Sequence, residues 1–180
     1  MIQRVLNIIS SVSLLATIFL INKGIGIGKI LAEMDIRVNY DLPQYYSYAV
    51  YIVMPMLFAW LLTRLFPKLR PGELQSGNVS EISADNSSFL AMILGYVFVG
   101  LSINNVHALL VIMGLLLIFN LCGNSYIFNP LFYLYGYRYY YLTSSGIKFL
   151  VMTKKKINLG SKGDFSKAKC LNDFTYIDFD

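Results

Sequence analysis

The side chains best suited to recognising an anion lie in the last third of the chain. The candidates for binding a partner there are Tyr137, Arg138, Tyr139, Lys154, Lys155 and Lys156. The three lysines have three candidate uses: a solvated turn that keeps other strands from pairing, binding of anionic lipid, and contact with nucleic acid through tyrosines that stack on bases. Because long apolar segments stand beside them, we expect lipid or a protein partner and no direct binding of nucleic acid.

No other pattern in the sequence is typical of a catalytic or metal site. Gly24–Lys29 reads GIGIGK, but a phosphate-binding P-loop needs four residues between its glycines and Ser or Thr after the lysine, where this chain has Ile30. The single His107 and the isolated Cys122 and Cys170 do not have the spacing of metal ligands. No paired carboxylates stand near the apolar segments. The sequence therefore predicts a protein that is not an enzyme and uses no cofactor or metal.

The composition indicates a membrane protein. Of 180 residues, 56% are hydrophobic and 14% are charged, against about 25% charged residues in soluble domains. The apolar residues stand in blocks, and the longest stretch, Phe89–Cys122, contains no Asp, Glu, Lys or Arg and turns once, at Asn104–Asn105. At about 1.5 Å per residue, each half approaches the roughly 30 Å of a bilayer core. We predict a mainly α membrane protein with four transmembrane helices, at about 5–22, 45–66, 87–103 and 106–122.

Aromatic and small residues predict how these helices are placed. Amphipathic rings settle at headgroup depth, and the candidate anchors are Tyr45, Tyr46, Trp60 and Tyr133. Small side chains let helices approach closely, and the candidate packing positions are Ser10, Ser13, Gly95, Gly100 and Gly114. We expect these positions to serve contacts within the chain or a homo-oligomer. The middle of each span lacks charged residues, which weighs against an ion-coupled transporter.

The basic residues predict the orientation. Those on the side of both chain ends and the second loop are Arg4, Arg64, Lys68, Arg70, Arg138, Lys148, Lys154, Lys155, Lys156, Lys162, Lys167 and Lys169. The opposite side carries only Lys23, Lys29 and Arg37, offset by Glu33, Asp35 and Asp41. Because lysine and arginine favour cytoplasmic loops, the sequence predicts a multi-pass protein of the bacterial inner membrane with both termini in the cytoplasm.

The chain divides into two predicted domains. Residues 1–124 form the transmembrane domain, and residues 125–180 form a small cytoplasmic β-rich module. In the module, Pro130 starts a short helix that Asn129 caps and Gly136 ends. A β-hairpin follows, with strands Tyr137–Thr143 and Ile147–Thr153. The polar segment Gly72–Ser88 reads as a solvated loop without a core of its own.

The second domain resembles a known family. The segment Asn129–Tyr141 has the form NPxxxxxGYxYY, Gly146–Lys156 completes the hairpin, and Asp173–Phe179 belongs to the ending LNDFTYIDF. These segments are similar to the KwaA membrane proteins of the Kiwa anti-phage defence system. The resemblance implies an oligomeric inner-membrane sensor of phage attachment that holds and regulates KwaB, a cytosolic DNA-binding effector, and it supplies no catalytic residues.

Two function classes follow from the sequence. The first is a non-enzymatic sensor or scaffold whose cytoplasmic face docks a soluble effector, since an uncharged membrane core stands beside an aromatic and basic tail. The second is a small oligomeric channel, transporter or holin-like protein, because short apolar helices can line a pore without internal charge.

Overall fold

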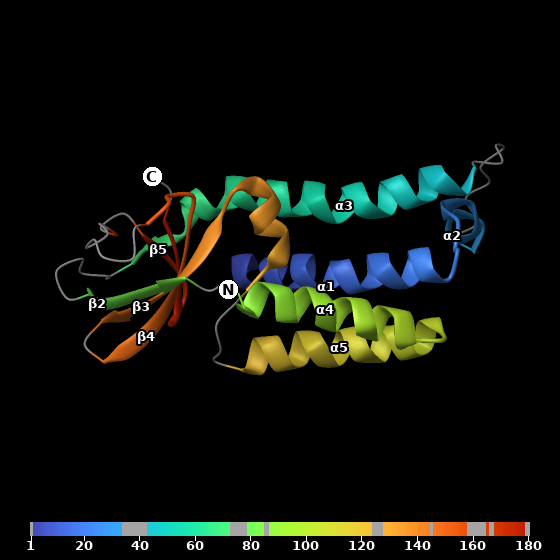
Figure 1. Ribbon diagram of the computed structural model, residues 1–180. Helices are drawn as coiled ribbons and strands as arrows, with labels where there is room; N and C mark the ends of the chain where they lie inside the picture. The colour runs from blue at the N-terminus through green and yellow to red at the C-terminus, as the bar shows by residue number, and fades with distance from the viewer. Residues whose placement is uncertain are drawn as a thin grey trace.

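The structure is a computed structural model of the chain, and it describes residues 2–33, 43–72, 79–84, 87–123, 128–144, 146–157, 165 and 168–178. A bundle of helices carries a β-sheet at one end (Figure 1). The helices are α1 (Ile2–Asn22), α2 (Ile27–Glu33), α3 (Gln44–Leu65), α4 (Ser87–Ser102) and α5 (Val106–Cys122), with 3-10 helices η1 (Phe66–Lys68) and η3 (Pro130–Tyr135). The strands are β1 (Arg70–Pro71), β2 (Val79–Ala84), β3 (Arg138–Ser144), β4 (Ile147–Thr153), β5 (Lys169–Asn172) and β6 (Thr175–Ile177).

Helix α1 is the centre of the bundle and contacts α3, α4 and α5. Its buried apolar residues recur at helical spacing: Ile8, Val12, Leu15 and Phe19. Two polar residues of the same helix, Ser11 and Thr17, are buried too and bond to neighbouring helices. Ser11 Oγ lies 2.9 Å from the Tyr96 hydroxyl on α4, and Thr17 Oγ1 donates to the carbonyl of Tyr51 on α3 at 3.0 Å. These contacts fix α1 against two neighbours.

The prediction of four transmembrane helices is wrong. Within the described residues, two helices are long and apolar enough to cross a membrane, judged by length and composition: Gln3–Asn22 and Gln44–Leu65. Helices α4 and α5 have 16 and 17 residues, so at about 1.5 Å per residue they fall short of roughly 30 Å. The turn between them shortens both, because α4 ends at Ser102 and Asn105 caps α5 by accepting from the Ala108 N–H at 2.7 Å.

The β-structure is also larger than the predicted C-terminal module. Six strands form one mixed sheet in the order β1-β5-β6-β4-β3-β2, in which β4 and β6 are parallel and the other pairs antiparallel. Strands β1 and β2 come from the segment between α3 and α4, part of which we expected to be a solvated loop. Strand β2 pairs along β3, where Ile82 lies opposite Leu142. The fold is therefore a helical bundle joined to a six-stranded sheet.

The local prediction for the hairpin is confirmed. Strands β3 and β4 pair from Arg138 opposite Thr153 to Ser144 opposite Ile147. The turn contains Gly146 with φ +79°, a left-handed conformation that glycine adopts without steric penalty. The predicted short helix is η3, where the Asn129 side chain accepts from the Leu131 N–H at 3.0 Å. It ends at Gly136, which also has φ +79°.

One face of the sheet packs on the end of the bundle. A single apolar cluster joins Ile8 of α1 and Leu62 of α3 to Tyr139, Leu150 and Met152 of the hairpin. The other face has its own cluster, formed by Leu142, Val151, Phe165 and Ala168. Because side chains alternate along a strand, Leu150 and Val151 serve opposite faces. The sheet is thus buried on both sides and attached firmly to the helices.

We predict that Gly100→Ala destabilises the bundle while Gly95→Ala does not. A Cβ at position 100 would lie 2.7 Å from Cγ2 of Ile18, and a β-branched side chain in a helix has little freedom to move away. Overpacking of this kind costs about 1–3 kcal/mol. A Cβ at position 95 meets nothing within 4 Å. Thermal unfolding in detergent measures both, and equal midpoints for the two variants would contradict the close packing of α1 on α4.

Candidate functional site

A hollow of about 480 Å³ lies beside the first residues of β3. We call it the junction pocket. Its lining residues come from β2, η3, β3 and the chain after β4: Ala84, Tyr133, Gly136, Tyr137, Arg138, Tyr139, Tyr140, Lys156 and Ile157. Figure 1 shows this region between the bundle and the sheet. The pocket therefore lies at the joint of the two parts of the fold.

A buried hydrogen-bond network holds the wall of the junction pocket. The Tyr139 hydroxyl donates to the carbonyl of Asn129 at 2.9 Å and lies 3.2 Å from its N–H. The Asn129 side-chain amide donates to Oδ1 of Asn7 on α1 at 2.9 Å. Asn129 is completely buried, and buried polar groups paired in this way position their neighbours firmly. The network ties β3 to the start of η3 and to α1.

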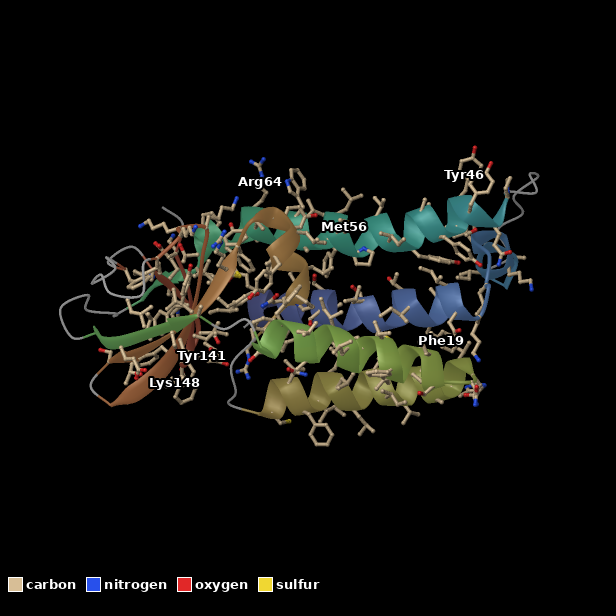
Figure 2. The ribbon with its side chains drawn as sticks, in the orientation of Figure 1. Phe19, Tyr46, Met56, Arg64, Tyr141 and Lys148 are labelled. Carbon is tan, nitrogen blue, oxygen red and sulfur yellow. The ribbon has the colours of Figure 1, made fainter. Side chains whose placement is uncertain are left out.

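Helix η3 is fixed from a second side. The Tyr135 hydroxyl donates to the carbonyl of Met56 on α3 at 2.6 Å, and Figure 2 shows Met56 midway along that helix. On the opposite side, the Tyr133 ring lies against Phe89 of α4, with ring centroids 4.1 Å apart. The chain thus enters β3 at a point set by three helices.

Two cations reach the junction pocket. Arg138 and Lys156 line it and both are exposed. A third, Lys154, is held nearby, because its Nζ lies 4.8 Å from the centre of the Tyr137 ring. Among the described residues that line the pocket, none is acidic. The pocket therefore presents positive charge beside aromatic walls, which suits an anion.

Lys155 takes no part in the junction pocket. Its Nζ lies 3.4 Å from Oδ2 of Asp178, a residue that is 1% exposed. The Thr153 hydroxyl donates to the same oxygen at 3.1 Å. A buried carboxylate needs such partners, so Lys155 stabilises the end of the sheet.

The predicted partner-binding residues thus separate into two groups. Arg138, Lys154 and Lys156 are exposed, whereas Tyr137 and Tyr139 are only 4% and 2% exposed. Burial raises the pKa of the Tyr137 phenol, so this ring stays neutral at physiological pH. The two rings form walls and the cations form the accessible surface. Tyr140, one of the tyrosines that the sequence offered for stacking on bases, is also buried, and its hydroxyl accepts from the Ile157 N–H at 3.2 Å.

The predicted anchors lie at both ends of α3 and at the junction pocket. Tyr45 and Tyr46 are exposed at its first turn, with ring centroids 4.4 Å apart. Trp60 lies near the other end, where the Arg64 guanidinium is 5.1 Å from the ring centre. Figure 2 shows Tyr46 far from the sheet and Arg64 close to it. Tyr133 is the ring that contacts Phe89.

The predicted packing positions have different surroundings. Gly100 lies against Ile18, whereas the positions of a Cβ at Gly95 and Gly114 are open. Ser10 is buried, and its carbonyl accepts from the Ser13 hydroxyl at 2.6 Å. Ser13 also lines an apolar groove of about 310 Å³ between α1 and α3, together with Ala16, Thr17, Leu20, Tyr51, Met54, Pro55 and Phe58.

Within the part of the chain that the structure describes, no group of three or more His, Cys, Asp or Glu side chains could hold a metal ion.

The comparisons with known proteins give one match. A family model described as anti-phage protein KwaA matches residues 3–177, which is nearly the whole chain. No curated protein and no solved structure matches the chain.

We predict that Tyr139→Phe lowers the free energy of unfolding by about 1–3 kcal/mol, because it removes the partner of the buried Asn129 N–H and leaves the Asn129 carbonyl with only the longer bond from the Phe132 N–H. The matched control is Tyr137→Phe. That ring is equally buried, and its hydroxyl is not part of the Asn129 network. Chemical denaturation in mild detergent measures both variants, and equal stability of the two would contradict the network.

Proposed function

We propose a role in detection for this chain, which belongs to the KwaA family of anti-phage proteins. It acts in anti-phage defence, and we propose that it does so as a sensor or scaffold of the bacterial inner membrane. In this proposal it docks a cytosolic, KwaB-like effector through the sheet, regulates it by binding, and performs no catalysis. It does not bind nucleic acid itself. The family match together with the sheet on an apolar bundle carries the proposal.

The outer surface of the helices supports a membrane location. Large apolar side chains are exposed along α3, α4 and α5, among them Met54, Leu57, Phe98, Leu110, Val111 and Phe119. A soluble monomer rarely exposes contiguous apolar surface of this extent. We propose that lipid covers it, with α1 and α3 crossing the membrane. Open space at Gly95 and Gly114 gives room for helices of a second copy, in keeping with a homo-oligomer.

The charges support a cytoplasmic sheet. At the sheet end, the Arg4 guanidinium donates to the carbonyls of Asn120, Leu121 and Gly123 at 3.2, 3.2 and 2.9 Å, where the α5 dipole favours a cation. Arg64 and the hairpin lysines lie at the same end. Three of the basic residues used to predict the orientation, Arg37, Lys162 and Lys167, lie outside the described residues. By the positive-inside rule, this end faces the cytoplasm.

The sheet supports docking because it is rigid and basic. Apolar clusters pack against both of its faces, so the chain that leaves β4 with the exposed Lys154 and Lys156 starts from a fixed position. The lysine run at the end of β4, with Arg138 opposite Thr153, concentrates positive charge on one side of the hairpin. Charged surfaces of this kind determine the rate and specificity of association. We propose that Lys154 contacts an acidic surface of the effector.

We predict that Lys154→Glu weakens capture of the soluble protein encoded by the neighbouring gene by about tenfold or more. We expect the same variant to protect cells less well against phage, which the plating efficiency of the phage measures. Lys148→Glu is the matched control, because Lys148 is also exposed and its Nζ lies 4.2 Å from the Tyr141 ring centre, at the outer part of the hairpin (Figure 2). The proposed docking surface would be contradicted if the Lys154 variant kept full capture and full protection. It would also be contradicted if the Lys148 variant lost as much capture as the Lys154 variant.

A further inference from the structure

We infer that the junction pocket binds the phosphodiester headgroup of an anionic lipid. This goes beyond docking of an effector, although it rests on the membrane location proposed above. Binding involves no chemical step and is a contact between two cations, aromatic walls and a phosphate. Its consequence is that the sheet is held against the cytoplasmic leaflet in one orientation.

The charge of the junction pocket selects an anion. Of the lining residues that the structure describes, Arg138 and Lys156 are the charged ones, and both are exposed. An arginine guanidinium matches two oxygens of a phosphate, while a lysine ammonium serves as a compact point charge. Lys154 adds a third cation close by, over the Tyr137 ring. A phosphate in the pocket would thus meet positive charge from β3 and from the chain that follows β4.

The location of the junction pocket favours a lipid headgroup over a soluble anion. Tyr133 lines it and contacts Phe89, the third residue of α4, whose outer surface is apolar. Ala84, the last residue of β2, lines it as well. The pocket therefore lies at the level where the chain passes from the sheet into the apolar bundle. This is the depth at which tyrosine rings and headgroup phosphates meet in a bilayer.

The size and rigidity of the pocket fit a headgroup. Its volume of about 480 Å³ is within the range of about 300–1,000 Å³ that is usual for small-ligand sites. The wall is held before any ligand arrives, because Tyr139 bonds to Asn129 and Asn129 bonds to Asn7. A site that needs no rearrangement loses less free energy on binding. The acyl chains of such a lipid would continue along the apolar surface of the bundle.

The test measures lipid binding by the full chain in neutral detergent, with no effector and no phage present. Native mass spectrometry counts bound dioleoyl phosphatidylglycerol, with dioleoyl phosphatidylcholine as the zwitterionic reference. The variant Arg138→Gln/Lys156→Gln should bind phosphatidylglycerol about tenfold more weakly or worse, since each cation near an anionic headgroup contributes about a factor of five. Binding of phosphatidylcholine should be unchanged.

The matched control is Arg70→Gln/Lys148→Gln, which removes one arginine and one lysine that are exposed on other strands of the sheet. It should bind phosphatidylglycerol within about twofold of the unchanged chain, because neither residue lines the pocket. Equal losses in the two double variants would show diffuse attraction to charge and overturn the site. No loss in the pocket variant would overturn it as well.

Two further measurements complete the test. Glycerol phosphate and inorganic phosphate in large excess should not displace phosphatidylglycerol, and displacement would assign the pocket to a soluble phosphate and overturn the lipid. If Arg138→Gln/Lys156→Gln does not fold, Lys156→Gln alone, which lies outside the strands, should still show a loss of about fivefold. Because no effector is present, failure here leaves the docking proposal standing, and failure of docking leaves the lipid site standing.

Discussion

Removal of the bundle's apolar surface from water is the constraint on which the rest of the structure depends. Helix α1 meets this constraint within the chain, because three helices contact it and its buried Ser11 and Thr17 hydroxyls bond to α4 and α3. The outer sides of α3, α4 and α5 have no such cover in one copy of the chain, and they remain apolar. In the membrane location that we propose, lipid covers that surface. The same location explains why the basic residues collect at the end that bears the sheet.

The sheet depends on the same bundle. Its inner face is closed by residues of α1 and α3, and the Asn7–Asn129–Tyr139 network gives the joint a fixed geometry. An isolated sheet of short strands would be marginal, so support from the helices accounts for its order. The joint also holds Tyr133 of η3, which packs on Phe89 of α4, at the junction pocket. A lipid bound in the junction pocket and an effector bound at Lys154 would therefore both contact the same rigid unit of sheet and bundle.

Local signals were predictable and long-range pairing was not. The Asn129 cap, the turns at Gly136 and Gly146 and the hairpin depend on neighbouring residues, so the sequence predicts them correctly. Strand β2 gains its structure from pairing with β3, and its polar composition concealed it. The bounds of α4 and α5 agree with the predicted 87–103 and 106–122 to within one residue, so the error was to treat helices of 16 and 17 residues as long enough to cross a bilayer. Tyr137 and Tyr139 were assigned to a binding surface, yet their spacing of two places both on one face of the sheet, and that face is buried.

Cysteine labelling tests the central claim most directly. Cys122 is exposed at the end of α5 nearest the sheet, whereas burial and, secondarily, the charge of Asp173 raise the pKa of the Cys170 thiol and make it slow to react. A membrane-impermeant maleimide is added to spheroplasts and to inside-out vesicles washed with alkali, with Cys122→Ser as the blank. The account predicts labelling of Cys122 in the vesicles alone. Labelling in intact spheroplasts, or loss of the chain in the alkaline wash, would contradict it.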